Sequence, residues 1–87
     1  MVQKNVKLIN PTGLSVHPAG VLCKEAVSFK CSIHFQFNNV VSNAKSVLSV
    51  LGAQIRCNDE ITLICDGVDE KEALERISEI IAEGLGE

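Results

Sequence analysis

The chain has 87 residues, of which 46% are hydrophobic, and its formal net charge is −3. This length allows one small domain, residues 1–87, and the apolar content excludes a disordered chain. Scattered Lys and Arg with few aromatic residues argue against nucleic-acid binding, and no apolar run is long enough for membrane insertion.

The first third of the chain predicts a strand, a turn and a helix. Alternating apolar residues indicate a strand over Val2–Ile9, and the Asn-Pro-Thr-Gly run at 10–13 indicates a turn. Ser15 then holds the N-cap position, and Pro18 suits a first helical turn. We expect the Ser15 hydroxyl to accept a first-turn N–H, a bond worth about 1 kcal/mol. The apolar face of this helix comprises Ala19, Leu22, Cys23, Ala26 and Phe29.

The middle of the chain predicts a hairpin followed by a short helix. Strict alternation over Cys31–Phe37 indicates a strand that is covered on one face only. Asn38-Asn39 suits a tight hairpin turn, after which Val40–Asn43 returns as a short strand. Ser46 is expected to cap a helix that Gly52 ends.

The last third predicts one more strand and the most amphipathic helix. A turn at Asn58-Asp59 precedes a strand marked by Ile61, Leu63 and Cys65. Asp69 and Glu72 have the spacing of a capping box. The final helix is expected to bury Ala73, Leu74, Ile77, Ile80, Ile81 and Leu85.

The order of these elements is β-α-β-β-α-β-α, and each strand has one polar face. A sheet covered by helices on one side only satisfies this pattern. The predicted fold class is therefore α+β, a two-layer open-faced sandwich.

The cysteines and the N-terminal segment indicate a reducing compartment. Residues 1–10 lack the hydrophobic block of a signal peptide, which favours a cytoplasmic protein. No Cys-x-x-Cys pair is present, and the cysteines fall where small apolar residues would. Buried free thiols are expected in preference to a disulfide or a metal site at Cys23, Cys31, Cys57 and Cys65.

The start of the first helix is the strongest candidate for a binding site. Free N–H groups and the helix dipole favour an anion there, and His17 stands in the first turn. A stripe beside the core face cannot point into the same core. It is interpreted either as a docking surface or as ordinary surface residues: Val16, Gly20, Lys24 and Val27.

The segment Asn10-Pro-Thr-Gly-Leu-Ser-Val-His-Pro-Ala-Gly20 resembles the active-site segment of HPr, the histidine-containing phosphocarrier of the bacterial phosphoenolpyruvate-dependent sugar phosphotransferase system. That family reads N-P-x-G-L-H-A-R-P-A. Residues 43–52 resemble its regulatory-serine segment, and residues 69–74 and 84–87 its last helix and tail. The resemblance implies a four-stranded antiparallel sheet with three helices on one face, no cofactor or metal, and a protein that is not itself an enzyme.

The resemblance departs at the phospho-acceptor. The family's histidine falls at Ser15, and its phosphate-contacting arginine falls at His17. A serine has no ring nitrogen to form a labile phosphoramidate, so the carrier role does not transfer directly. One alternative is a carrier that uses His17, whose side chain has a ring nitrogen able to form a phosphoramidate. A Ser15–His17 hydrolytic pair is weaker, because residues two apart in a helix do not face each other.

The preferred interpretation is regulatory and rests on Ser46. Crh-type members of the family lack the histidine but keep the regulatory serine, which is the combination seen here. The implied partners are HPr kinase/phosphorylase, enzyme I, enzyme IIA and a catabolite control transcription regulator. The docking surface is also expected to include His17 and, by resemblance, Val47, Leu48 and Leu51. A third alternative is an interaction module without phosphorylation.

Overall fold

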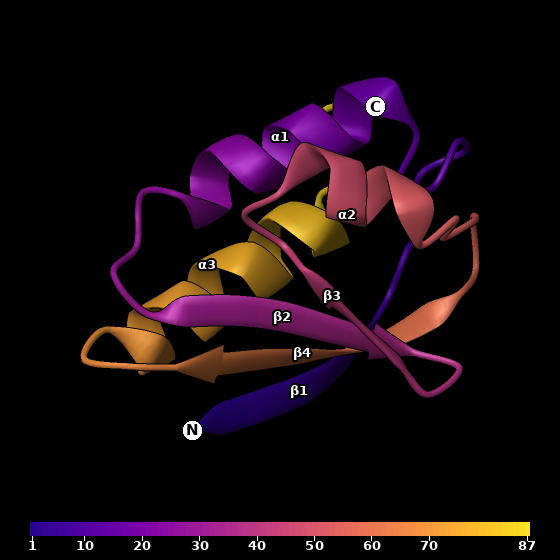
Figure 1. Cartoon of the computed structure of the whole chain (residues 1–87). Helices are drawn as coiled ribbons and strands as arrows, with labels where there is room; N and C mark the ends of the chain where they lie inside the picture. Colours follow the sequence, from indigo (N-terminus) through magenta and orange to yellow (C-terminus); the bar gives the residue numbers. More distant parts are fainter.

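The computed structural model describes residues 1–87, and its elements follow the expected β-α-β-β-α-β-α order (Figure 1). β2, β4, α1 and α3 coincide with stretches of the matching hydrophobic period, whereas β3 is placed by the hairpin turn before it. None of the three helices has the length and apolar character needed to traverse a lipid bilayer. The elements are β1 (Val2–Lys7), α1 (Val16–Ala26), β2 (Ser32–Phe37), β3 (Val40–Asn43), α2 (Val47–Gly52), β4 (Glu60–Asp66) and α3 (Glu70–Ala82).

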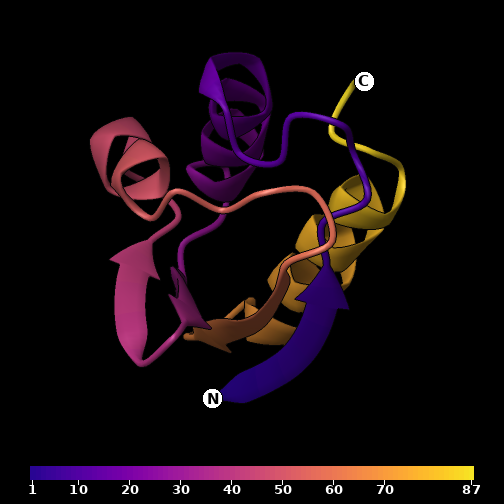
Figure 2. The same ribbon diagram turned by 90° about the vertical axis from the view of Figure 1, so that its right-hand side faces the viewer.

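The four strands form one antiparallel sheet in the order β1-β4-β2-β3. Figure 2 shows all three helices on the same side of this sheet, which leaves the other face open. The alternation in β2 is realised as predicted, because Ile33 and Phe35 are fully buried while Ser32 is exposed. The predicted open-faced α+β sandwich is therefore confirmed.

The space between sheet and helices is filled by a single cluster of 19 buried apolar residues. Phe35 lies at its centre on β2, with Leu63 beside it on β4. Leu22 of α1 and Ile77 of α3 cover them from the helical layer and are also fully buried. Each such side chain contributes about 1.5–3 kcal/mol relative to exposure, so this cluster fixes which faces of α1 and α3 turn outward.

The β2–β3 hairpin has the predicted two-residue turn. Asn38 and Asn39 have φ of 51° and 66°, and Phe37 pairs directly with Val40. Positive φ at both central residues is the type I′ geometry, whose twist matches that of the flanking strands. Asparagine tolerates this left-handed region better than most residues, which explains why two of them stand here.

The first strand and the first helix are shorter than predicted. β1 ends at Lys7 because Leu8 leaves the ladder and exchanges backbone bonds with the turn at Asn58–Asp59, at 2.6 and 2.9 Å. α1 ends at Ala26, so Phe29 packs on the core from the following loop rather than from the helix.

Two helix ends also differ from the expectation. Gly52 is the last residue of α2, and the left-handed residue that follows the helix is Gln54, with φ of 55°. α3 ends before Leu85, which is buried from a turn in which Gly84 has φ of 89°. The N–H of Leu85 donates to the carbonyl of Ile80 at 3.0 Å, the long bond of a Schellman ending. This ending directs residues 85–87 back toward the start of α1.

The predicted capping box at Asp69 and Glu72 is wrong. Asp69 holds the N-cap position of α3 but makes no side-chain cap bond. Its carboxylate instead accepts the backbone N–H groups of Lys30 and Cys31, each at 2.8 Å. The bond from Lys30 is the largest cause that lowers the pKa of Asp69. Asp69 therefore fastens the α1–β2 loop to the start of α3.

All four cysteines are free thiols, but only two are buried as predicted. Burial raises the pKa of Cys31 to about 11 and also raises the pKa of Cys65. Both therefore stay protonated and unreactive at neutral pH. Cys23 of α1 and Cys57, in the turn between α2 and β4, are only half-buried.

A pair of glycine substitutions tests how tightly the loop before α1 is held. Gly13 has φ of +60°, and a Cβ there would lie within 2.7 Å of Arg56 Cα and closer still to the Ile55 carbonyl. We expect Gly13→Ala to lower the free energy of unfolding by about 2–4 kcal/mol, from backbone strain and steric overlap.

Gly20→Ala is the matched control, since a Cβ at this helical position meets nothing within 4 Å. It should raise stability by about 0.5–1 kcal/mol through helix propensity. Chemical denaturation of the two variants measures both effects. Equal stability of the Gly13→Ala protein and the wild type would contradict the described contact.

Candidate functional site

The loop that precedes α1 is held on the segment between α2 and β4. The N–H of Leu14 donates to the carbonyl of Ile55 at 3.0 Å, and Gly13 packs against the same backbone. Inside the loop, the side-chain amide of Asn10 donates to the carbonyl of Gly13 at 2.6 Å. Asn10 is 2% exposed, so this bond is part of the interior. The loop is thus a fixed platform for Ser15 and His17.

Ser15 does not cap α1 through its side chain, contrary to the prediction. Its carbonyl accepts the N–H of Ala19 at 2.8 Å, so it does hold the N-cap position. An N-cap oxygen usually bonds to the second or third helical N–H, and the third residue here is Pro18, which has none. The Ser15 hydroxyl turns outward instead and donates to Thr12 Oγ1 at 2.8 Å.

A network that links this loop to the end of the chain was not foreseen from the sequence. The Thr12 hydroxyl lies 2.7 and 2.8 Å from the two carboxylate oxygens of Glu87. The same carboxylate accepts the side-chain amide of Asn10 at 2.9 Å and the N–H of Thr12 at 3.3 Å. The bonds from Asn10 and then Thr12 lower the pKa of Glu87. No local pattern signals a contact between residues separated by 75 positions.

His17 is exposed in the first turn of α1, as predicted. It lies against the same terminal segment: a Cβ at Gly86 would be 3.3 Å from its Nε2 atom. The hydroxyl of Ser15 is engaged with Thr12, and no hydrogen bond joins it to His17. The arrangement therefore has no nucleophile–base contact of the kind that a hydrolytic pair uses.

Ser46 caps α2 as predicted. Its Oγ accepts the N–H of Ser49 at 3.3 Å, and its carbonyl accepts the N–H of Val50 at 2.9 Å. The turn before it is fixed by Asn43, whose side-chain oxygen accepts the N–H of Lys45 at 2.9 Å. Ser46 is half-buried, so its hydroxyl lies at the surface of a well-defined turn.

The predicted docking residues lie on two neighbouring helices. α1 and α2 lie side by side in both views (Figures 1 and 2). Val16 and Leu48 are the most exposed apolar side chains among them, at 74% and 83%. Leu51, by contrast, is half-buried and packs on the core. We define the α1–α2 surface as Val16, Gly20, Lys24, Val27, Val47, Leu48 and Leu51.

A cleft of about 400 Å³ separates the loop before α1 from the end of α2. Thr12, Ser15 and Val16 line one side, and Leu51 and Arg56 are among the residues on the other. It therefore joins the position-15 loop to the α1–α2 surface. Arg56, which the sequence did not single out, is its one cationic residue.

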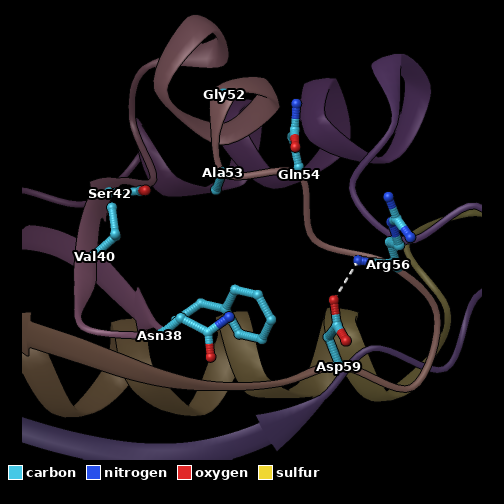
Figure 3. A pocket seen from close by; sticks show the side chains of 9 residues that line it. Asn38, Val40, Ser42, Gly52, Ala53, Gln54, Arg56 and Asp59 are labelled. Carbon is cyan, nitrogen blue, oxygen red and sulfur yellow. Dashed lines mark hydrogen bonds between the residues drawn. The ribbon is translucent and has the colours of Figure 1, made fainter.

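A larger hollow of about 450 Å³ lies on the other side of the 53–56 segment (Figure 3). The end of the β2–β3 hairpin and the segment after α2 line it. Arg56 borders it through its backbone, whose N–H donates to Asp59 at 2.8 Å. None of the site residues predicted from the sequence lines this hollow. Nor does any cluster of three His, Cys, Asp or Glu residues suited to a metal ion occur in the chain.

Comparison with known proteins identifies relatives over nearly the whole chain. The family model described as "PTS HPr component phosphorylation site" matches residues 2–83. The HPr-like protein Crh of Bacillus subtilis is 34% identical, over 95% of this chain and 98% of the relative. Phosphocarrier protein HPr of Buchnera aphidicola is 35% identical, over 93% of this chain and 95% of the relative.

Solved structures of related proteins have the same fold. The crystal structure of HPr-C-His from Thermoanaerobacter tengcongensis superposes with a TM-score of 0.97 at 28% sequence identity. The match covers 100% of this chain and 98% of that one. That structure therefore shares the arrangement of sheet and helices described above.

The two N-cap serines make a matched pair for a stability test. Ser15→Ala should change the free energy of unfolding by less than about 0.5 kcal/mol, because Ser15 makes no cap bond and is exposed. Ser46→Ala should cost about 1 kcal/mol through the lost cap to Ser49. Thermal or urea unfolding of both variants gives the comparison. A larger loss at Ser15 than at Ser46 would contradict the cap assignment.

Proposed function

The chain belongs to the HPr family of the phosphotransferase system, and we propose that it is a regulatory member controlled by phosphorylation at Ser46. The observation that carries this proposal is the pairing of a serine at position 15 with a surface serine that begins α2. In this proposal the protein acts in the cytoplasm, with the other proteins of that system.

Position 15 explains why a relay role is disfavoured. A carrier must hold phosphate in a bond that the next protein can break at low cost, which a phosphoramidate provides. A phosphoserine is a stable ester and a poor donor. The Ser15 hydroxyl is also engaged with Thr12, and no general base contacts it. Neither its chemistry nor its surroundings favour phosphoryl transfer through Ser15.

The surroundings of Ser46 suit a regulatory phosphate. Its cap bond to Ser49 is long at 3.3 Å, so the hydroxyl is held weakly and is replaceable by a phosphate oxygen. A phosphate adds between one and a half and two negative charges. Those charges would stand next to Val47 and Leu48, which are exposed apolar residues of the α1–α2 surface.

Partner choice would then follow from the changed character of this surface. Without phosphate, the α1–α2 surface is mostly apolar, with Lys24 as its only charged residue. With phosphate, it combines an apolar patch with a dianion. The proposed partners are HPr kinase/phosphorylase, enzyme I, enzyme IIA and a catabolite control transcription regulator. Because the charge lies at the surface, the switch needs no large change of fold.

A carrier that uses His17 is the second candidate. It is favoured by the exposure of His17 in the first turn of α1, two residues from the family's phospho-accepting position. Its weakness is the nearness of the Gly86 backbone, where an added Cβ would lie 3.3 Å from Nε2 and where the chain leaves little free space on that side of the ring. An interaction module without either phosphate is the third candidate.

The regulatory proposal predicts where a serine kinase of this system places phosphate. Incubation with HPr kinase/phosphorylase and ATP should add one acid-stable phosphate to the wild type and none to Ser46→Ala. Ser28→Ala is the control, because Ser28 is an exposed serine beyond the end of α1. Mass spectrometry of the intact proteins counts the phosphates.

Labelling of Ser46→Ala to the wild-type level would place the regulatory site elsewhere. Ser46→Asp should keep the fold, since Asp is also a good N-cap. It should reproduce the effect of phosphate on partner binding only in part, because it carries one charge and lacks three-oxygen geometry.

The carrier alternative makes the opposite prediction with enzyme I and phosphoenolpyruvate. The wild type should acquire little or no acid-labile phosphate, whereas Ser15→His combined with His17→Arg should acquire it efficiently. Strong acid-labile labelling of the wild type that His17→Ala abolishes would establish the carrier role instead. If neither ATP with the kinase nor phosphoenolpyruvate with enzyme I labels the protein, the third candidate, an interaction module without phosphorylation, is supported.

A further inference from the structure

The turn at Asn10 and Thr12 binds a carboxylate in this structure, and that carboxylate comes from the chain itself. Three donors converge on the Glu87 side chain: the Asn10 amide at 2.9 Å, the Thr12 hydroxyl at 2.7 Å and the Thr12 N–H at 3.3 Å. We propose that this turn is an anion-binding site and that Glu87 is its internal, displaceable ligand.

The site combines one buried donor residue, Asn10, with the exposed Thr12. Asn10 is 2% exposed, and its amide nitrogen serves two acceptors, Glu87 and the carbonyl of Gly13. Because both neighbours are acceptors, they fix which end of the amide faces them. Removal of Glu87 without replacement would leave a buried N–H of Asn10 without a partner, which is unfavourable. The site therefore favours occupation by an anion.

The occupant is held in a way that permits exchange. Glu87 is exposed, and it belongs to a segment anchored through the buried Leu85 two residues earlier. Glycines on both sides of Leu85, Gly84 and Gly86, have positive φ. The side chain of residue 87 is thus able to leave while Leu85 stays in the core.

Occupation of the turn is connected to position 15 by a short chain of hydroxyl groups. Ser15 donates to Thr12 at 2.8 Å, and the Thr12 hydroxyl donates in turn to Glu87. Because Thr12 has a single hydroxyl proton, the carboxylate orients it and leaves its oxygen as the acceptor for Ser15. Loss of Glu87 frees that proton, so Ser15 loses its fixed orientation. The latch formed by Asn10, Thr12 and Glu87 therefore sets the geometry of the loop before α1.

The ligand class follows from the donor set. Two amide-type N–H groups and one hydroxyl, with His17 nearby, suit a carboxylate or a phosphate. Inorganic phosphate is the simplest probe, because it differs chemically from the Glu87 carboxylate that already occupies the turn. The proposal does not depend on phosphorylation of Ser46, so the failure of either leaves the other standing.

The test is a phosphate titration of the isotope-labelled chain, followed through the backbone amide resonance of Thr12. Glu87→Gln should bind phosphate about tenfold more tightly than the wild type, the factor expected if the latch is closed nine-tenths of the time. Glu83→Gln is the matched control, because it removes the same charge from an exposed glutamate without side-chain bonds. It should behave like the wild type.

Two further measurements separate the site from a general charge effect. Thr12→Val in the Glu87→Gln background should weaken phosphate binding at least about tenfold, because one of the three donors is lost. Equal phosphate affinity of the wild type and Glu87→Gln would overturn the proposal. The absence of phosphate binding in both proteins would overturn it as well. So would a titration in which only amide resonances outside the loop before α1 change position.

The pH dependence of stability gives an independent check on the latch. The folded pKa of Glu87 lies below its ordinary value of 4.5, chiefly through the Asn10 and Thr12 bonds. The stability that the latch adds is therefore present above pH 4.5 and is lost as pH falls through the lowered pKa. Wild type should exceed Glu87→Gln in stability near pH 6, and the two should converge as the pH falls below the lowered pKa of Glu87. A difference independent of pH would contradict the ionic latch.

Discussion

The close approach of the Gly13 backbone to the Ile55–Arg56 peptide is the contact on which the rest of the site depends. There is no room for a side chain at Gly13, and its positive φ sends the chain directly into Leu14 and the first turn of α1. Leu14 then bonds to the same Ile55 carbonyl group. Because residues 55–56 follow α2, this one approach fixes the loop before α1 relative to α2. The cleft between them is its consequence.

The starts of α1 and α2 show that the third helical residue decides whether an N-cap serine forms a side-chain cap bond. Both Ser15 and Ser46 hold N-cap positions, yet only Ser46 uses its oxygen as a cap. The third residue of α2 is Ser49, which has an N–H to give, whereas the third residue of α1 is Pro18. The freed hydroxyl of Ser15 is exposed and becomes part of the polar network with Thr12.

Local periodicity predicted most of the fold, because a strand or helix that is buried on one face has apolar residues at a regular spacing. That spacing is every second residue in a strand and every third or fourth residue in a helix. The alternation in β2 and the asparagine pair after it needed no knowledge of distant residues. The errors arose where a polar side chain had a choice of partners. Asp69 bonds to Lys30 and Cys31 across the fold rather than to its own helix. The contact of Glu87 with Thr12 likewise joins opposite ends of the sequence, where spacing carries no signal.

The strand order has a consequence for how the protein is made. β1 precedes every other described element in the chain, yet its partner in the sheet is β4, which ends roughly 60 residues later. At translation rates of 5–20 residues per second, β1 waits about 3–12 s for that partner. The β2–β3 hairpin, by contrast, closes within microseconds of its emergence. During synthesis, residues 2–7 therefore remain without a sheet partner until β4 has emerged, after α1, the β2–β3 hairpin and α2.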